Sequence, residues 1–134
     1  MANYYEKART NYFRVKNPDS FNEFVSRFNS IEVVPHSPDD GSIAILFDED
    51  GGVPSYYYDD DDNDVEIDFI EELASYLTDD SILVVIGVGS EKYRYLSGFA
   101  TAMNNKGESV NINLGEIYDL AEKKFGVKPN LAEY

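Results

Sequence analysis

Residues 81–88, Ser-Ile-Leu-Val-Val-Ile-Gly-Val, form a nearly continuous apolar run that is rich in β-branched side chains. A run of this kind is typical of a strand in the middle of a sheet, with both of its faces covered. We therefore expect a sheet built around these residues. The run is far too short to cross a bilayer, which takes about 20 apolar residues in a helix, so no membrane insertion is expected.

Upstream of this strand the sequence predicts a strand, a helix and a hairpin. Residues 10–16 have the aromatic and β-branched content of a short strand. Asn17 and Pro18 suit the N-cap and the first position of a helix. Residues 31–34 and 42–47 are expected to pair across a Pro-Asp-Asp-Gly turn. The expected helix has apolar side chains at the spacing of one face, namely Phe21, Phe24, Val25 and Phe28.

Two further elements are expected between that hairpin and the central strand. Residues 53–58 read as an edge strand, because Pro54 cannot donate a hydrogen bond to a neighbouring strand. Residues 66–77 read as a second helix whose apolar positions face the core and whose outer face is anionic.

The chain after the central strand predicts a second hairpin and a last helix. Residues 93–103 and 109–114 are expected to pair across the turn at residues 104–107. Asn113 and Gly126 suit the start and the end of the helix that follows. The predicted fold is α+β and a single domain over residues 1–134. It has three helices and an antiparallel-rich sheet of five or six strands, in the order βαββ(β)αβββα, with the first two helices on one face.

The negative charge of the chain is concentrated in one region. Residues 28–91 are 64 consecutive residues that contain 18 carboxylates and no lysine or arginine, which gives a net charge of −18. The rest of the chain has a net charge of +3, so the whole chain has −15. Ordinary surfaces intersperse both signs. Such a field repels nucleic acid and anionic lipid and attracts cationic partners, so neither direct nucleic-acid binding nor membrane binding is expected.

The acidic region also offers a candidate partner-binding surface. Carboxylates on alternate strand residues or on one helix face are spaced in a way that resembles the phosphates along DNA. Tyrosine beside carboxylates is a good binding anchor, because it offers a rigid ring with a polar tip. The candidate partner-binding residues are Tyr56, Tyr58, Asp59, Asp60, Asp61, Asp62, Asp64, Asp68, Glu71 and Glu72. A solvated surface that only keeps the chain soluble is the alternative interpretation.

The acidic residues between 60 and 71 raise the question of a calcium site. Five acids fall at positions 1, 3, 5, 9 and 12 of an EF-hand loop, namely Asp60, Asp62, Asp64, Asp68 and Glu71. Position 6, however, requires a glycine and is Val65 here, and no helix is expected before the loop. We therefore predict no metal site and no cofactor, and keep calcium binding as a minor alternative.

No catalytic constellation emerges from the sequence. The chain has no cysteine, which suits a reducing cytoplasm and excludes thiolate chemistry, and it has a single histidine, His36. The glycines at 87 and 89 lack the spacing of a phosphate-binding loop. Residues 1–9 contain no apolar signal segment, so a cytoplasmic location is expected. The sequence predicts a binding protein and not an enzyme.

Three stretches resemble a family of small acidic accessory proteins from phages, plasmids and other mobile elements. They are ARTNYFRVKNPDSF, then GGVPSYYY followed by EIDFIEELASYL, and VGSEKYRYLSGFATAMN. The family has no known catalytic motif, and such proteins resemble anti-CRISPR or antirestriction inhibitors. The resemblance implies a mobile-element context more than a mechanism. Together with the acidic surface it leads us to expect an inhibitor of a host defence nuclease that imitates DNA, with a basic nucleic-acid-binding protein such as a CRISPR effector or a restriction enzyme as partner. The alternative is a mobile-element adaptor or structural binding protein.

Overall fold

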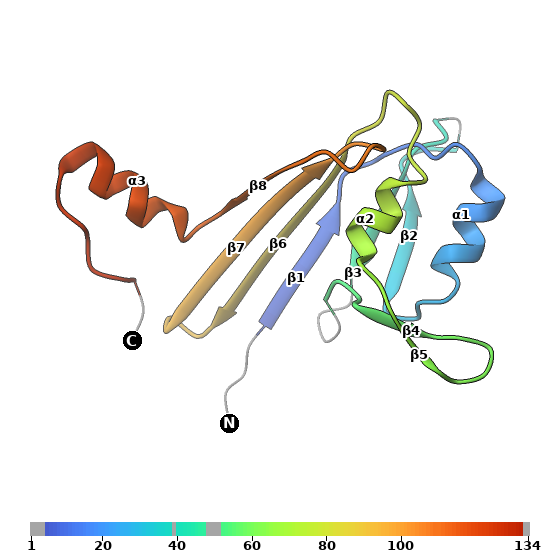
Figure 1. Ribbon diagram of the computed structural model, residues 1–134, viewed down its shortest axis with the longest axis horizontal. Helices are drawn as coiled ribbons and strands as arrows, with labels where there is room; N and C mark the ends of the chain where they lie inside the picture. Colours follow the sequence, from blue (N-terminus) through green and yellow to red (C-terminus); the bar gives the residue numbers. More distant parts are fainter. Residues whose placement is uncertain (1–4, 39, 48–51, 133–134) are drawn as a thin grey trace.

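The computed structural model describes residues 5–38, 40–47 and 52–132. It contains a six-stranded antiparallel sheet with the strand order β2-β3-β1-β6-β7-β8, together with a separate two-stranded sheet, β4-β5 (Figure 1). The strands are β1 (Tyr5–Thr10), β2 (Ile31–Pro35), β3 (Ile43–Phe47), β4 (Tyr56–Tyr58), β5 (Asp64–Glu66), β6 (Leu83–Glu91), β7 (Tyr95–Met103) and β8 (Ser109–Asn113). The helices are α1 (Pro18–Val25), α2 (Phe69–Ala74) and α3 (Glu116–Phe125). The predicted α+β class and the antiparallel-rich sheet of five or six strands are confirmed.

The core lies between one face of the sheet and the helices α1 and α2. Phe69, the first residue of α2, is at its centre, with ring centroids 5.6 Å from Phe24, 5.0 Å from Phe28 and 5.7 Å from Phe47. Because residues from α1, α2 and β3 meet in this aromatic cluster, both helices are fixed on the same face. The other core side chains include Phe13, Phe21, Ile45, Leu73, Leu77, Leu83 and Val85.

The first strand lies earlier in the chain than predicted. β1 ends at Thr10, and residues 11–16 contribute only isolated bridges of Phe13 and Val15. The reason is Asn11, whose side-chain amide donates to the Ile82 carbonyl and accepts from the Val84 amide, and so replaces ladder hydrogen bonds. Phe13 nevertheless reaches the core, where it is 1% exposed.

β6 lies between β1 and β7, as expected for the apolar run, but only one of its faces is covered. Leu83 and Val85 point into the core. Ile86 and Val88 are at even-numbered positions of the same strand, so their side chains lie on the opposite face, where they are 52% and 56% exposed. The expectation that both faces are covered is wrong for the single chain. The face opposite α1 and α2 is called the back face below.

The segment before α2 also differs from the prediction. The edge strand expected at residues 53–58 is the shorter β4, which pairs with β5 and not with the main sheet. The helix expected at residues 66–77 begins only at Phe69, because Asp68 is its N-cap and accepts a hydrogen bond from the Glu71 amide at 3.2 Å. It ends at Ala74, followed by a tighter turn in which the Leu77 amide bonds the Ala74 carbonyl.

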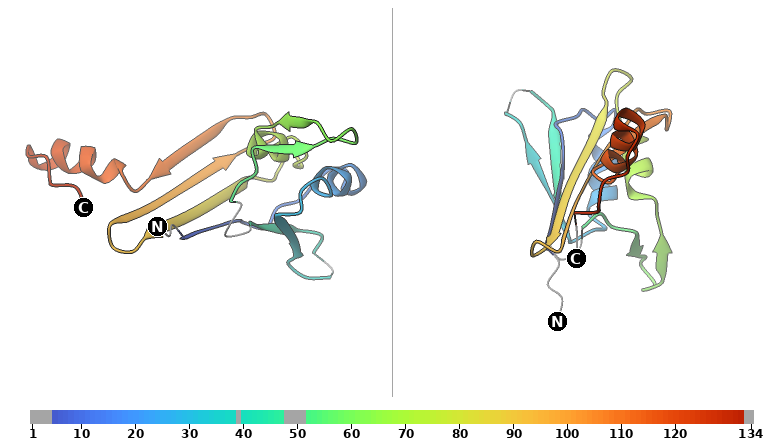
Figure 2. Two further views of the ribbon diagram at one scale, coloured as in Figure 1. Left: turned by 90° about the horizontal axis from the view of Figure 1, so that it is seen from below. Right: turned by 90° about the vertical axis from the view of Figure 1, so that its left-hand side faces the viewer.

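The C-terminal part follows the predicted elements, yet α3 lies away from the core. The turn at residues 104–107 closes β7 and β8, with Gly107 at a φ of 83° that favours glycine. The Asn113 side chain accepts from the Glu116 amide at the start of α3. α3 then extends beyond β8, at the opposite end of the long axis from the β4-β5 hairpin (Figures 1 and 2), and none of its residues is buried. Among the described residues, no helix has the length and apolarity needed to span a membrane.

Candidate functional site

The predicted partner-binding residues gather on the β4-β5 hairpin and the start of α2. The strands pair antiparallel, with Tyr56 opposite Glu66, Tyr57 opposite Val65 and Tyr58 opposite Asp64. Asp59 to Asn63 form the connecting turn. The hairpin projects past α2 at one end of the molecule (Figures 1 and 2), so its tip is accessible to a large partner.

The two faces of the hairpin have different roles. Directly paired residues in an antiparallel ladder point to the same side, so Tyr56, Tyr58, Asp64 and Glu66 share one face. Tyr56 and Tyr58 are 49% and 59% exposed, and their rings contact edge to face at 5.6 Å. A hydrogen bond with Tyr56, together with the charges of Tyr56 and Asp64, raises the pKa of Tyr58 above its ordinary value.

The opposite face of the hairpin is attached to the body of the protein by Tyr57. Its ring packs edge to face against Phe28 at 5.7 Å, and the Arg27 guanidinium lies over it at 5.1 Å. A groove of about 460 Å³ lies beside this contact, lined by residues 26–30 and 53–58. Tyr57 therefore positions the hairpin, whereas the rings of its neighbours Tyr56 and Tyr58 remain exposed.

Asp59 organises the acidic turn from within. Its carboxylate accepts hydrogen bonds from the amides of Asp61 and Asn63, both at 2.9 Å, and its own amide bonds the Asn63 carbonyl. The hydrogen bonds from the Asn63 and Asp61 amides lower the pKa of Asp59. Asp62 adopts a φ of 61°, a conformation that Asp tolerates better than most residues. Asp59 is therefore a structural residue of the turn, whereas Asp60, Asp61 and Asp62 project into solvent.

Of the three acids at the start of α2, Asp68 has a structural role, whereas Glu71 and Glu72 are exposed without one in the described hydrogen bonds of their side chains. Asp68 is exposed but caps the helix, so its loss affects stability as well as charge. Glu71 and Glu72 are exposed in the first turn, where the helix dipole favours negative charge.

The exposed acids of this surface are not among the residues that form ion pairs in the described part of the chain. The ion pairs seen there include Arg14 with Asp40, Lys16 with Asp79, Arg27 with Glu23, and His36 with Asp40. None of them includes a member of the exposed group that we call the acidic face. The acidic face consists of Asp60, Asp61, Asp62, Asp64, Glu66, Asp68, Glu71 and Glu72.

The geometry does not resemble an EF-hand. Asp60 and Asp62 lie in a β-hairpin turn, Asp64 is a strand residue and Asp68 caps a helix, so the five acids do not line one loop between two helices. Across residues 5–38, 40–47 and 52–132, no three or more Asp, Glu or His side chains are grouped to hold a metal ion.

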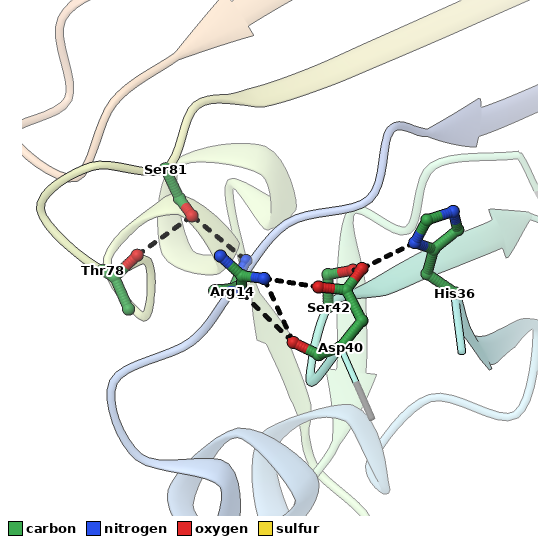
Figure 3. Close-up of polar contacts among 6 residues, drawn as sticks. All are labelled: Arg14, His36, Asp40, Ser42, Thr78 and Ser81. Atoms are coloured by element: carbon green, nitrogen blue, oxygen red, sulfur yellow. Dashed lines mark hydrogen bonds and ion pairs between the residues drawn. The ribbon is translucent and has the colours of Figure 1, made fainter. Parts of the chain in front are cut away.

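A second polar cluster, around Asp40, joins three loops (Figure 3). Its carboxylate accepts from the Ser42 hydroxyl at 2.6 Å, contacts His36 Nδ1 at 2.6 Å and pairs with the Arg14 guanidinium. The Arg14 amide donates to Ser81 Oγ, which also accepts from the Thr78 hydroxyl. Hydrogen bonds from Ser42, His36 and Arg14 hold the pKa of Asp40 well below its ordinary value.

This cluster contains Ser, His and Asp, but in an order that does not activate a nucleophile. In a catalytic triad the imidazole lies between the serine and the carboxylate and takes the serine proton. Here the Asp40 carboxylate lies between Ser42 and His36, so the serine hydroxyl is held as a donor to an anion. The arrangement fits a clamp that ties the β2–β3 loop to Arg14.

Sequence reasoning missed Glu66 and the Asp40 cluster. The sequence predicts Glu66 as the first residue of a helix, although its spacing of two from Asp64 would place both on one face of a strand. The spacing of four between His36 and Asp40 gave no comparable signal within a turn-rich segment.

No protein-family model, no curated protein and no solved structure matches this chain.

Proposed function

We propose that this protein is a non-catalytic inhibitor of a nucleic-acid-binding defence nuclease, of the anti-CRISPR or antirestriction type, and that the acidic face imitates the nucleic acid. The observation that carries the proposal is the β4-β5 hairpin. It projects from the body and presents carboxylates without a basic partner in the described protein, beside two exposed tyrosines.

The spacing of the carboxylates suits a site that normally binds a sugar-phosphate backbone. Asp64 and Glu66 are alternate residues of one strand and lie about 6.6–7 Å apart. The turn residues Asp60, Asp61 and Asp62 precede this strand and are exposed, and Glu71 and Glu72 are exposed in the first turn of α2, which follows it. Such a series can occupy several phosphate positions of a nucleic-acid channel at once.

The cost of desolvation defines the kind of partner. Removing a carboxylate from water costs several kcal/mol unless a cation replaces the water. A partner of the acidic face therefore has to supply arginines and lysines at matching positions. Nucleic-acid channels of nucleases have this composition. Tyr56 and Tyr58 add an uncharged contact, since an arginine can stack on their rings.

A comparison of two charge-reversal variants tests the proposal. In the hairpin variant Asp61, Asp64 and Glu66 are changed to Lys, and Asp68 is kept because it caps α2. The control variant changes Glu32, Glu108 and Glu122 to Lys, three exposed carboxylates outside the acidic face, so that the net charge changes equally. DNA binding and cleavage are measured for a panel of CRISPR effectors and restriction endonucleases with each protein added.

We expect the wild type to inhibit one class of these nucleases and to compete with its DNA. The hairpin variant should bind that nuclease at least tenfold more weakly, which corresponds to about 1.4 kcal/mol. The control variant should bind like the wild type. Equal inhibition by wild type and hairpin variant would mean that the carboxylates serve solubility and that an adaptor function on another surface is the better account.

A further inference from the structure

The single chain leaves the back face of β6, β7 and β8 open. Residues that pair directly share a face, so Ile86 lies beside Ala100 and Ile112, and Val88 beside Gly98. Large apolar side chains on this face are more than half exposed, namely Ile86, Val88, Leu96, Val110, Ile112 and Leu114. A strand as apolar as β6 is normally covered on both sides, so a second cover is missing from the single chain.

α3 is the second uncovered element. Its apolar residues Ile117, Leu120 and Phe125 lie on one stripe and are 60%, 58% and 74% exposed. Val127 and Leu131, which follow the helix, are also more than half exposed. α3 follows β8 and extends away from the sheet, so this helix does not cover the back face of its own chain (Figures 1 and 2).

The combined apolar area of these two surfaces approaches that of a stable interface. A Val, Leu, Ile or Phe side chain carries on the order of 100 Å² of apolar surface, so eleven that are each more than half exposed leave roughly 600 Å² open. This reaches the upper end of the patches found on monomers, about 300–600 Å². It is close to the roughly 800 Å² that each partner contributes to a standard interface.

The charge of the region favours a second copy of the chain over an oppositely charged partner. Residues 92–134 contain six bases and five acids, a net charge of +1, although the whole chain has −15. Two copies can therefore approach through this part without the repulsion that residues 28–91 would produce. The acidic hairpins lie at the far ends of the two molecules in such an approach (Figure 1).

The free edge of β8 offers a self-complementary contact. The Leu114 amide bonds the Gly98 carbonyl and the Asn104 amide bonds the Glu108 carbonyl, which places the backbone groups of Val110 and Ile112 toward β7. The N–H and C=O groups of Ser109, Asn111 and Asn113 then point outward. No described strand lies beside them, whereas the other edge strand, β2, ends in Pro35.

We propose that two copies of this chain form a two-fold symmetric dimer through β8, with α3 of each copy on the back face of the other. The two β8 strands run antiparallel with Asn111 opposite its own copy and Val110 opposite Ile112 of the other. This pairing satisfies the outward backbone groups and continues the sheet across the dimer. It also brings the two uncovered apolar surfaces together, since α3 extends beyond the β8 edge toward the position of the second sheet.

The absence of cysteine from the chain allows a specific cross-linking test. In the proposed pairing the two Asn111 Cα atoms lie about 5.5 Å apart, within the range of a disulfide. Asn111→Cys should therefore form a disulfide-linked dimer under mild oxidation. Asn22→Cys, at an exposed position on α1, is the matched control and should stay monomeric on a non-reducing gel. No nuclease is needed, so the result is independent of the proposed function.

Sedimentation equilibrium supplies the second readout. The wild type should be a dimer, and Ile112→Glu with Leu120→Glu should raise its dissociation constant at least tenfold while the acidic hairpin is unchanged. A wild type that stays monomeric at all concentrations overturns the proposal and leaves these surfaces to a different partner. A dimer that persists in the double variant also overturns it. Should the double variant fail to fold, Asn111→Cys decides: specific cross-linking supports the proposal, and its absence overturns it.

Discussion

Tyr58 lies directly opposite Asp64 in the β4-β5 ladder, so that an exposed aromatic ring and an exposed carboxylate share the same face of a projecting hairpin. Tyr56 and Glu66 repeat this relationship one pair further along. The tyrosines and the acids follow one another in the sequence, and the strand pairing places them side by side on one surface that carries both aromatic rings and carboxylates. The hairpin fold is therefore what makes these residues a candidate binding site.

Removing the Tyr58 ring should weaken binding without disturbing the fold. The side chain is 59% exposed, and the hairpin is held by Tyr57, which packs on Phe28. We expect Tyr58→Ala to weaken binding to the inhibited nuclease about tenfold, whereas Tyr58→Phe keeps the stacking area and most of the affinity. Titration calorimetry measures both. Wild-type affinity in Tyr58→Ala would remove the ring from the binding site.

We expect that Asp68 contributes to the stability of the fold mainly through its N-cap hydrogen bond, and less through its charge. Its carboxylate accepts from the Glu71 amide and begins α2. Asp68→Ala is expected to lower the free energy of unfolding by about 1 kcal/mol, and Asp68→Asn, which can still cap, by much less. Urea denaturation gives both values. If Ala and Asn were equally destabilising, the carboxylate charge and not the cap would be the cause.

Phe69 is expected to be the most sensitive residue of the core. It is 1% exposed and contacts rings from α1 and β3. Phe69→Ala should cost about 3–5 kcal/mol of unfolding free energy, because it removes a large side chain and leaves a cavity. Phe69→Leu should cost clearly less. Chemical denaturation followed by circular dichroism is the measurement, and a loss below about 1 kcal/mol would contradict the assigned core.

Asp40 should give the protein part of its sensitivity to acid. Hydrogen bonds from Ser42, His36 and Arg14 lower its pKa in the folded state below the ordinary value of 3.8. A lowered pKa stabilises the fold above the unfolded pKa, and this stabilisation is lost as the pH falls toward the folded one. Asp40→Asn should therefore be less stable at neutral pH and should lose less stability below about pH 4 than the wild type.

Thermal unfolding across a pH series tests this expectation. Asp60→Asn, in the exposed turn of the acidic hairpin, is a suitable control and should follow the wild-type profile. An Asp40→Asn profile parallel to the wild type over the acid range would show that the cluster around Asp40 does not contribute to the pH dependence.

Local signals predicted some elements well. The Asn17 cap and the phenylalanine spacing identified α1, and the glycine turn at 104–107 identified the β7-β8 hairpin. Neither depends on distant parts of the chain. The placement of β1 between β3 and β6 depends on contacts between residues far apart in the sequence, which periodicity does not report.

The sequence predicted most residues of the candidate site, but it did not predict the two-stranded sheet that carries them. Charge counting identified the exposed acids, since carboxylates without basic neighbours remain in solvent. Of the three residues of β5, Glu66 is the one that the sequence predicts as the start of a helix, because Ile67 and Ile70 after it fit helical spacing. Pairing with β4 overrides that local preference, so the two-stranded sheet and the role of Glu66 were missed.

The dependence of binding on salt is the most direct test of the acidic face. Raising the salt from about 50 mM to about 500 mM shortens the screening length to a few Å, so affinity that rests on exposed charges should fall steeply. We expect a steep decrease for the wild type and for the Glu32, Glu108 and Glu122 control. The hairpin variant with lysines at 61, 64 and 66 should show a much flatter dependence. Equal slopes for the wild type and the hairpin variant would contradict the central claim that the acidic face binds the partner.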